Sequence, residues 1–479
     1  MTAGVMKSVH PTPREASPRD TVLLVHPSGT RGRSALAHGF LIPPLGLMSL
    51  VAQLRRHGHS VRLINEEIDG PAPLRLLAPT SSEAPLFVGI YASQASEDRV
   101  RAMIRACRDR STALRIVVGG PATQAPESFL EAGADAAGLG EGDETILDLV
   151  AWAHGDRSLG DVPGVVFARN GTVERTATRP LVRDLDTLPF PNWDDYPPDR
   201  TRYDNLYPSV RQPFATLITS RGCPMRCVYC ASPEIWRRAV RRRSVGSVLE
   251  EIDGLRARFG VRFLDIYDDV FNLAPRWTVE FCEALLRRGN PPLRWGAYFY
   301  PANFDAGLLR LARRAGLSVL KIGVQSGSPE ILRNIQRRPE TAEQATLFLD
   351  EAARLGIFSS ADFIFGLPGE TARTLADSVR YIRGIRADAI KIGKLVRLPG
   401  SPLDRQESPV PAAVTDAEID RAVREALFKY YLRPAGIAHG LRWVAHRQAA
   451  GLHGIIGLAR VAFAGRSFRP ARQARSVDR

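Results

Sequence analysis

Short apolar runs alternate with amphipathic, helix-patterned runs along most of this chain, and the alternation falls into two blocks. The first block begins with TVLLVHP at Thr21 and continues through PPLGLMSLVAQLRRHG, HSVRLIN, PLFVGIYAS, SEDRVRAMIRACRDR and RIVVGGP. Apolar runs of this length between helical runs are typical of buried parallel strands joined by helices. The first block therefore predicts an open, Rossmann-like α/β domain over residues 18–155.

The second block repeats the alternation in FATLITS, VRFLDIYDD, LRWGAYFY, SVLKIGVQSGS, SSADFIFGLPGE and AIKIGKLVRL. About six strand–helix units fit a partial (β/α)6 barrel of the TIM type better than a closed barrel of eight, and we expect it over residues 209–410. The Pro- and Asp-rich residues 156–208, with a hairpin-like piece, are predicted to be a linker. Residues 1–17 are predicted to be a flexible lead-in, and residues 411–479 a helical, basic C-terminal region.

The net charge of +14 raises the question of nucleic acid, but it comes largely from arginines scattered along the chain, so we expect no nucleic-acid partner. The amino terminus lacks the apolar core of a signal peptide, and no apolar run is long enough to span a bilayer. These features predict a cytoplasmic protein. The arginine-rich tail has two interpretations, a helical cap on the substrate side of the barrel or a basic amphipathic helix in peripheral contact with an anionic membrane.

Three of the five cysteines, Cys223, Cys227 and Cys230, form a CxxxCxxC cluster just beyond the strand FATLITS. Three thiolates suit three irons of a [4Fe–4S] cluster and leave the fourth iron for an exogenous ligand. A structural zinc would need a fourth Cys or His, and the loop contains neither; zinc and three incidental core thiols remain the alternatives. Cys107 and Cys282 lie on apolar helix stripes and are predicted to be inert.

The cysteine loop, with the aromatic Tyr229 before its last cysteine, resembles the signature of the radical S-adenosylmethionine (SAM) superfamily. The resemblance implies that SAM binds the free iron through its amino and carboxylate groups. It also implies reductive cleavage of SAM to a 5′-deoxyadenosyl radical, which abstracts a hydrogen atom from the substrate. An external electron donor such as a flavodoxin or ferredoxin is then a required partner.

Three later segments resemble further parts of the same family in order and spacing. Asp268 and Asp269 end a strand where the family holds the methionyl amino group; a helix N-cap pair is the alternative. Gln325 and Ser326 lie in GVQSGS, which resembles the strand that contacts the ribose and carboxylate, although the usual acidic residue is a glutamine here.

The run DFIFGLPGET resembles the family's strand and turn on the adenine side of SAM. Phe365, Gly366 and Leu367 are its candidate cofactor-binding residues. Its two glycines, Gly366 and Gly369, are expected to let the backbone approach a ligand closely.

The first block resembles the cobalamin-binding domain that precedes the radical barrel in one large branch of the superfamily. Three segments carry the resemblance: PPLGLMSLVAQLRRHGHSV, VVGGPATQAPESFL and GLGEGDETILDL. The residues expected to bind the corrinoid are Tyr91, Ser93, Gly119, Gly120, Pro121, Gly140, Glu141 and Gly142. Small residues among them would make room for the lower face and nucleotide tail, but ordinary turns beside a sheet are the alternative.

The axial ligand of cobalt is left open, because the D-x-H-x-x-G motif that supplies a histidine in other cobalamin proteins is absent. Whether His26 or His38 approaches cobalt does not follow from the sequence, since a lone histidine is more often a surface or capping residue. The glycines near Gly140 lack the spacing and position of a dinucleotide fingerprint, so a nicotinamide cofactor is not expected.

Taken together, these resemblances predict a cobalamin-dependent radical SAM enzyme similar to the class B methyltransferases. They imply that one SAM methylates cobalt and a second yields the radical, so that an unactivated carbon or a phosphorus of a small molecule receives the methyl group. The basic, partly apolar tail favours a lipid-like substrate over other natural products. The alternatives are radical cyclisation, rearrangement or oxidation without methyl transfer, and a non-catalytic scaffold of the same fold.

Overall fold

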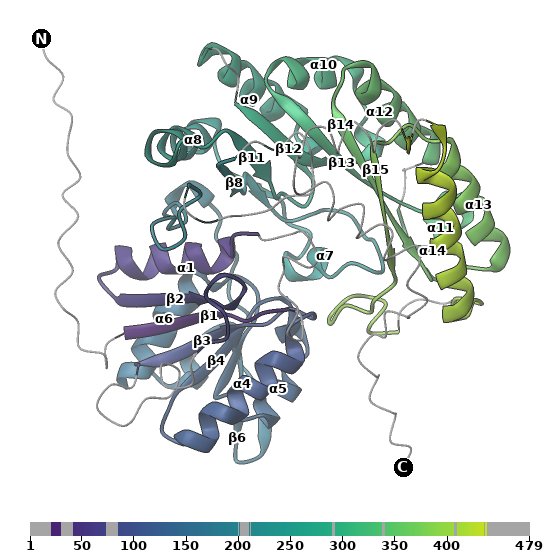
Figure 1. Ribbon diagram of the computed structural model, residues 1–479. Coiled ribbons are helices and arrows are strands. Elements are labelled where there is room, and N and C mark those ends of the chain that lie inside the picture. Colours follow the sequence, from purple (N-terminus) through teal and green to yellow (C-terminus); the bar gives the residue numbers. More distant parts are fainter. Residues whose placement is uncertain are drawn as a thin grey trace, which may run out of the picture. The chain divides into compact units, whose positions relative to one another are not determined.

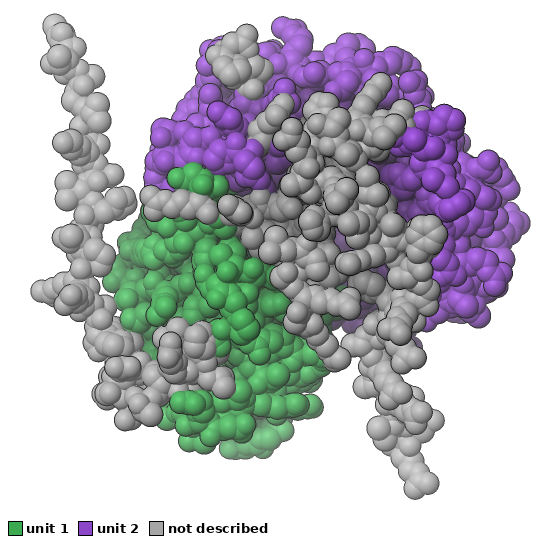
Figure 2. Space-filling model, in the orientation of Figure 1, with its two compact units in different colours: residues 1–37, 43–201 green, residues 38–42, 202–479 purple. Residues whose placement is uncertain are grey.

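The structure is a computed structural model that describes residues 21–29, 42–72, 85–199, 201, 210, 212–289, 293–337, 341–406, 410–434, 436 and 437. The chain divides into two compact units (Figure 2). Unit 1 comprises residues 1–37 and 43–201, and unit 2 comprises residues 38–42 and 202–479. Each unit is described separately, and His38 lies outside the described residues.

Unit 1 contains a seven-stranded sheet in the order β2-β1-β3-β4-β5-β6-β7 (Figure 1). Its strands are β1 (Thr21–His26), β2 (Ser60–Asn65), β3 (Phe87–Tyr91), β4 (Ile116–Gly119), β5 (Ala136–Gly138), β6 (Val165–Arg169) and β7 (Thr172–Arg175). The first five strands are parallel, as the sequence predicts, whereas β6 and β7 form an antiparallel hairpin on β5. The hairpin placed in the predicted linker 156–208 thus extends the sheet, because the apolar residues of β6 continue the core.

The helices of unit 1 are α1 (Leu45–Arg56), α2 (Glu66–Asp69), α4 (Glu97–Arg110), α5 (Glu127–Glu131) and α6 (Gly142–His154). On α4 the residues with the predicted apolar spacing, Val100, Met103, Ile104 and Cys107, are all buried in one core cluster with β1, β3 and β4. Burial raises the pKa of the Cys107 thiol to about 11, which keeps it protonated at neutral pH. Its predicted role as an inert core residue is confirmed.

Unit 2 is built on six parallel strands in the order β15-β14-β13-β12-β11-β8. They are β8 (Phe214–Leu217), β11 (Phe263–Ile266), β12 (Arg294–Phe299), β13 (Leu317–Gln325), β14 (Phe358–Phe365) and β15 (Ala389–Lys394). Because β8 and β15 are the two edges of this sheet and do not pair with each other, the predicted open barrel of six units is confirmed. A two-stranded ribbon, β9 (Ser220–Arg221) with β10 (Arg241–Arg242), follows β8.

In unit 2, helices α8, α9, α10, α12 and α13 run along the outer side of the strands, whereas α7 lies apart from them (Figure 1); the bounds of all its helices follow. They are α7 (Ser232–Ile235), α8 (Val245–Phe259), α9 (Pro275–Arg287), α10 (Ala306–Arg314), α11 (Pro329–Asn334), α12 (Ala342–Arg354), α13 (Ala372–Gly384) and α14 (Asp416–Tyr431). Capping boxes begin α12, α13 and α14. No helix in the described part of the chain is both long and apolar enough to span a membrane. The basic tail beyond residue 437, to which membrane contact was assigned, lies outside that part.

Candidate active site

The three cysteines lie in the loop that leaves the carboxyl end of β8, as predicted. Gly222, directly before Cys223, has a φ of +102°, and a Cβ there would collide with the carbonyl oxygen of Ala239. Glycine is therefore required for the loop to turn away from the ribbon β9–β10. Within the loop the amide of Cys230 donates to the carbonyl of Cys227 at 3.1 Å, which closes a tight turn.

Asp268, at the end of β11, fixes the chain just before this loop. Its Oδ1 accepts the amides of Thr219 at 2.7 Å and Ser220 at 3.0 Å, and its Oδ2 accepts their hydroxyls at 2.5 and 2.6 Å. Arg242 lies 3.4 Å from Oδ2, and the carboxylate is only 2% exposed. Both oxygens are thus occupied by the protein, and Asp268 is a positioning residue for the cysteine loop.

Asp269 has a different environment from its neighbour. It is exposed, and its Oδ1 accepts the hydroxyl of Ser232 at 2.6 Å. The interpretation of the two aspartates as a helix N-cap pair is wrong, because the next helical turn begins after Val270 and α9 after Ala274. The carboxylates bond instead to the segments on either side of the cysteines.

The middle of the cysteine loop is anchored through Val228. Its amide donates to the carbonyl of Ile335 at 3.2 Å, and its carbonyl accepts the amide of Leu403 at 2.9 Å. Its side chain packs in an apolar cluster with Ile335 and Leu367, against which Tyr229 is partly buried. The loop is therefore supported by the segment after α11 and by the turn after β14.

The cysteine thiols are shielded from water on most sides. Burial, together with the nearby charge of Asp269, raises the pKa of Cys223 to about 11 and that of Cys230 to about 12. Metal ions replace such protons when they bind, since the thiolate is the ligand. A buried thiol group of this kind is thus suited to hold a metal cluster away from solvent.

Arg337 is a residue of this site that sequence reasoning missed. It is 9% exposed. Its Nη1 lies 4.0 Å from the Cys227 sulfur and 3.2 Å from the Tyr229 hydroxyl. Its Nη2 donates to the carbonyl of Gly323 at 2.5 Å. The guanidinium also lies 5.2 Å from the ring centroid of Tyr300. No motif surrounds Arg337 in the sequence, so only the fold shows that a fixed positive charge lies beside the cysteines.

Gln325 ends β13 in a left-handed conformation, with a φ of +69° at a non-glycine residue. Its side-chain amide folds back over Gly323, where a Cβ would collide with it. Such backbone strain at the end of a barrel strand is typical of functional sites. Ser326 points away, since its hydroxyl bonds to Ser378 of α13 at 3.0 Å and accepts the amide of Ser328 at 3.1 Å.

The turn after β14 contains Phe365, Gly366 and Leu367, and all three are buried. The space into which a Cβ of either glycine would point is filled by the protein. A Cβ on Gly366 would lie 3.0 Å from the side chain of Ile419, and one on Gly369 would collide with Asn334. The amides of Gly366 and Leu367 both donate to the buried carboxyl of Glu370, which sequence reasoning also missed.

The donor set of the cysteine loop fits an iron–sulfur cluster, because Cys223, Cys227 and Cys230 are three free thiols in one loop. No three His, Cys, Asp or Glu side chains among the described residues are grouped to hold a single metal ion. This is compatible with a cuboidal cluster, in which each cysteine binds its own iron.

Cys282, on α9, is fully buried in the barrel wall with its pKa raised to about 12 by burial, so its predicted inert role is confirmed.

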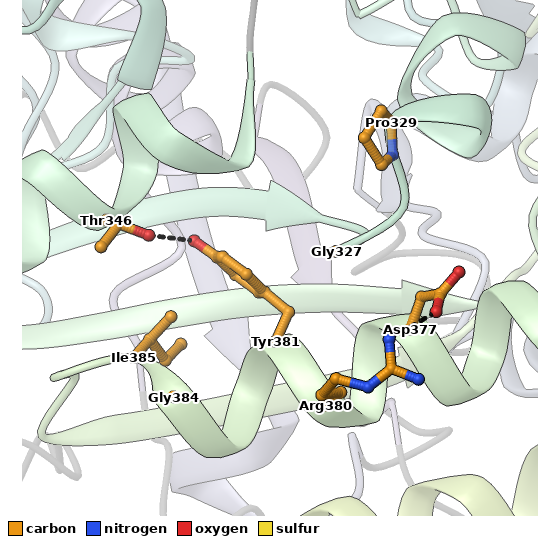
Figure 3. A pocket seen from close by; sticks show the side chains of 8 residues that line it. All are labelled: Gly327, Pro329, Thr346, Asp377, Arg380, Tyr381, Gly384 and Ile385. Carbon is orange, nitrogen blue, oxygen red and sulfur yellow. Dashed lines mark hydrogen bonds and ion pairs between the residues drawn. The ribbon is translucent and has the colours of Figure 1, made fainter.

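Unit 2 also has a hollow of about 460 Å³ (Figure 3). It is formed by α12, α13 and the turn after β13, and its lining residues are Gly327, Pro329, Thr346, Asp377, Arg380, Tyr381, Gly384 and Ile385. Tyr381 and Thr346 share a hydrogen bond of 3.0 Å across it. None of the predicted cofactor-binding residues lines this hollow, and we assign it no role in the site.

The second candidate site is the carboxyl edge of the sheet in unit 1. β1 lies between β2 and β3 in the sheet. The chain therefore passes from β1 to β2 on one side and then crosses to β3 on the other side of β1. Open α/β sheets bind ligands at such a switch point. His26 and Tyr91 end β1 and β3 there and stack with ring centroids 5.1 Å apart. Burial lowers the pKa of His26, and its Nδ1 has no hydrogen-bond partner among the described residues.

The predicted small residues at this edge separate into two groups. A Cβ on Gly119 or Gly140 would meet nothing within 4 Å, so protein packing does not require glycine there. Gly120 has a φ of +112° and lies against the carbonyl of Ala92, where a Cβ would be 2.6 Å away. The open positions are compatible with close approach of a large ligand.

The other predicted corrinoid residues mainly organise the edge itself. Ser93 bonds to Ser96 in the turn before α4, through its amide at 3.0 Å and its hydroxyl at 3.1 Å, and Pro121 is exposed on the turn after β4. The carboxylate of Glu141 accepts the amide of Val182 at 2.8 Å. Gly142 packs α6 against α1, because a Cβ would lie 3.2 Å from Leu50.

Thr123 was not singled out from the sequence, yet it is fully buried at the same edge. Its hydroxyl lies 2.7 Å from the carbonyl of Gly120 and 2.6 Å from that of Gly138. It therefore ties the ends of β4 and β5 together. The sequence signal that could have indicated this role is the position of Thr123, three residues after the glycine pair.

Two parts of the chain match known protein families. Residues 217–382 match the Radical SAM superfamily, and residues 35–150 match the B12 binding domain. The chain thus combines a B12 binding domain with a radical SAM domain. Its cofactors are a [4Fe–4S] cluster, SAM and cobalamin.

Relatives of this radical SAM enzyme match over most of its length. An uncharacterized methyltransferase of Pyrococcus horikoshii is 26% identical, covering 82% of this chain and 88% of its own. The anaerobic magnesium-protoporphyrin IX monomethyl ester cyclase of Cereibacter sphaeroides is also 26% identical, covering 86% of this chain and 71% of its own. The radical SAM methyltransferase TsrM of Kitasatospora setae shares the fold, with a TM-score of 0.65 at 20% identity over 80% of this chain and 74% of its own.

Proposed function

We propose that this radical SAM enzyme transfers a methyl group from SAM to an unactivated carbon or phosphorus of a small-molecule natural product or lipid-like substrate. One observation supports this above all others. The same chain combines a loop of three cysteines with a separate B12-binding unit, and its other two cysteines are buried in helix cores. A cluster held by three thiolates keeps one iron open.

When bound, the cluster supplies reductive cleavage of SAM, and cobalamin supplies a carrier for the methyl group. The residues of this chain position and shield these groups. Asp268 holds the start of the cysteine loop, and the apolar cluster around Val228 excludes water from one side of it. Arg337 places a fixed positive charge beside Cys227, which favours its thiolate form.

Among the predicted SAM ligands, Asp269 is the better candidate for the methionyl amino group. Asp268 is buried and uses both oxygens within the protein, whereas Asp269 is exposed and accepts the Ser232 hydroxyl and the Gly222 amide. Gln325, held in a strained conformation beside Arg337, is proposed to contact SAM through hydrogen bonds. The electron for the cluster is proposed to come from an external flavodoxin or ferredoxin in the cytoplasm.

The proposal is tested by incubating the reconstituted protein anaerobically with reductant, cobalamin and methyl-labelled SAM. 5′-Deoxyadenosine, S-adenosylhomocysteine and label in the corrinoid fraction are measured together, and no substrate is needed. We expect S-adenosylhomocysteine and labelled corrinoid in equal amounts. The variant Cys227→Ala should lose 5′-deoxyadenosine formation, whereas Cys282→Ala, which removes a buried thiol outside the loop, should retain it.

Radical cyclisation or rearrangement is the second candidate, and the match to a cyclase over 86% of this chain favours keeping it. It predicts bound cobalamin and 5′-deoxyadenosine, with no label in the corrinoid fraction. A protein that binds no cobalamin would contradict both candidates.

A further inference from the structure

The turn that follows α7 presents two consecutive arginines beside the cysteine loop, and we call residues 236–239 the arginine turn. Arg237 and Arg238 have φ values of +50° and +57°. The amide of Arg238 donates to the carbonyl of Pro233 at 2.8 Å, and the amide of Ala239 donates to that of Trp236 at 2.9 Å. Both arginine side chains are exposed. The backbone of the turn is therefore held by hydrogen bonds, while its two charges face solvent.

Two left-handed residues in a row are an unfavourable conformation for arginine. In this conformation the Cβ crowds the following carbonyl oxygen, so glycine, asparagine and aspartate are the usual residues there. An exposed side chain gains little packing that could offset this cost. Strained residues of this kind cluster at functional sites. The presence of Arg237 and Arg238 is thus better explained by a role on the surface than by folding.

The arginine turn is attached directly to the start of the cysteine loop. A Cβ on Gly222 would collide with the carbonyl oxygen of Ala239, the last residue of the turn. At the beginning of α7, the hydroxyl of Ser232 donates to Asp269 at 2.6 Å, and Asp269 also accepts the amide of Gly222. Since Gly222 precedes Cys223 in the chain, a protein docked on the arginine turn would lie next to the cysteines.

Positive charge is concentrated in the segment that contains both the cysteine loop and the arginine turn. Residues 221–243 include seven arginines and one acidic residue, Glu234. Two of these arginines are paired with buried carboxylates: Arg242 with Asp268 and Arg243 with Glu251. Three positive charges remain in excess even if Glu234 and Asp269 each neutralise one further arginine. The segment therefore favours a partner with negative charge.

A cluster that cleaves SAM reductively needs an electron from outside the chain. The donor loses one electron and the cluster gains it, and no proton or group is transferred with it. Electron carriers of the flavodoxin and ferredoxin type are small acidic proteins, and opposite charges steer two proteins together and fix their orientation. Arg226, between Cys223 and Cys227, is also exposed, so positive charge continues into the cysteine loop. The sign and the position of the charge both suit such a carrier.

We propose that the arginine turn, together with Arg226, is the docking surface for an acidic electron-carrier protein that reduces the cluster. This rests on the proposed function, because it assumes that the three cysteines hold a cluster that takes up one electron for each reductive cleavage of SAM. Arg237 and Arg238 contact the carrier and are not part of the cofactor site. The docking surface thus determines how fast the cluster is reduced, and not which substrate is methylated.

The test compares two reductants on the full chain loaded with cluster and cobalamin. Cluster reduction by a pre-reduced bacterial flavodoxin is followed by rapid-mixing absorbance at low and high salt, and dithionite serves as a small donor that needs no docking. The double substitution Arg237→Asn with Arg238→Asn removes two charges and suits the left-handed backbone. At low salt, flavodoxin should reduce this variant about tenfold more slowly than the wild type or slower still, and the difference should shrink as salt rises. Dithionite should reduce both proteins at the same rate.

Two further variants separate local charge from net charge. Arg237→Lys with Arg238→Lys keeps both charges and should react with flavodoxin at close to the wild-type rate. The matched control is Arg313→Gln with Arg314→Gln, which removes two consecutive exposed arginines at the end of α10 and should also leave the rate unchanged. Equal slowing by the asparagine pair and the glutamine pair would overturn the assignment, and so would a wild-type flavodoxin rate in the asparagine pair.

A nucleic acid is the other polyanion that a basic surface attracts. Binding of a short RNA duplex that is lost in the asparagine pair, with no change in the flavodoxin rate, would assign the arginine turn to nucleic acid and overturn the proposal. Cluster reduction is measured without SAM. The labelling of the corrinoid with dithionite as reductant reports the proposed function separately, so the two ideas fail in different assays.

Discussion

The two cofactor sites differ in what their glycines do. In unit 1, a Cβ on Gly119 or Gly140 would meet nothing within 4 Å, although the φ of +74° at Gly140 favours glycine and Gly120 packs against the carbonyl of Ala92. In unit 2, Gly222, Gly366 and Gly369 are required by neighbouring atoms of the chain itself. Open glycine positions thus occur at the sheet edge of unit 1, beside the packed Gly120 and Gly142, whereas the glycines of these barrel turns in unit 2 all allow tight packing.

This difference suggests how each cofactor is held. The cysteine loop is held by contacts within the protein, through Asp268, Val228 and Leu367. At the edge of unit 1, a Cβ on Gly119 or Gly140 would meet nothing within 4 Å, which is compatible with the close approach of a large corrinoid. We therefore expect substitutions in the barrel site to act mainly on stability, and those at the sheet edge to act mainly on binding.

The largest effect is expected for Asp268→Ala. The substitution leaves two amides, two hydroxyls and Arg242 without their buried acceptor, and removing one partner of a buried charge pair costs about 3–5 kcal/mol. Chemical denaturation should show this loss together with low iron content after reconstitution. Asp253→Ala, which breaks the exposed pair with Arg288, should cost at most about 1 kcal/mol. Equal losses in the two variants would contradict a positioning role for Asp268.

The next effect concerns Glu370, whose pKa burial raises from 4.5 to about 7. Between these two pH values the folded protein binds more protons than the unfolded chain, so stability falls as the pH rises and levels off above pH 7. The difference between the two pKa values corresponds to a change of roughly 3 kcal/mol at most in the free energy of unfolding. Glu370→Gln keeps an acceptor for the amides of Gly366 and Leu367 and should flatten this part of the stability profile.

Unfolding by denaturant at several pH values between 5 and 8 measures the Glu370 contribution. Glu425→Gln, on the exposed face of α14 and paired with Lys429, serves as the control and should keep the wild-type pH dependence. If the free energy of unfolding changes with pH in the same way in the wild type and in Glu370→Gln, the Glu370 carboxyl is not protonated in the folded protein.

Much of the fold could be predicted from the sequence, because period and run length determine the strands and helices of both units. The cysteine loop followed from three residues at fixed spacing after a strand. Arg337, Glu370 and Thr123 could not be predicted in the same way. Each acts through a contact with a distant segment, and a single charged or hydroxyl side chain on an otherwise ordinary stretch carries no local pattern.

The hairpin of β6 and β7 shows the same limit from the other direction. Its turn chemistry was visible, but the sheet that it joins was not, since pairing with β5 depends on a register that no short segment encodes. Asp268 was predicted from the sequence as a cofactor-binding residue, and that part of its role stays a prediction. Only its contacts with Thr219 and Ser220, on the neighbouring strand's loop, reveal that it acts within the protein.

A glycine series tests the comparison between the units directly. Gly119→Ala should change the free energy of unfolding by less than about 0.5 kcal/mol, because a Cβ there meets nothing, and should weaken cobalamin binding. Gly120→Ala and Gly366→Ala place a Cβ on residues with positive φ and should cost about 1–3 kcal/mol each. Denaturation and spectroscopic cobalamin titration measure the two quantities. Unchanged cobalamin affinity in Gly119→Ala would remove this edge from the corrinoid site.

The smallest effect is expected for substitution of Arg337. It tests whether the surroundings of the cysteine loop influence the reduction potential of the cluster. Reduction adds negative charge beside a guanidinium that is 9% exposed, so Arg337→Met should lower the reduction potential of the cluster, by tens of millivolts on the scale of such nearby charges. Arg337→Lys keeps the charge and should shift the potential less. Potentiometry followed by electron paramagnetic resonance reports this without any turnover. If the methionine and lysine variants shift the potential equally, the contribution of Arg337 is its hydrogen bonds to Tyr229 and Gly323 and not its charge.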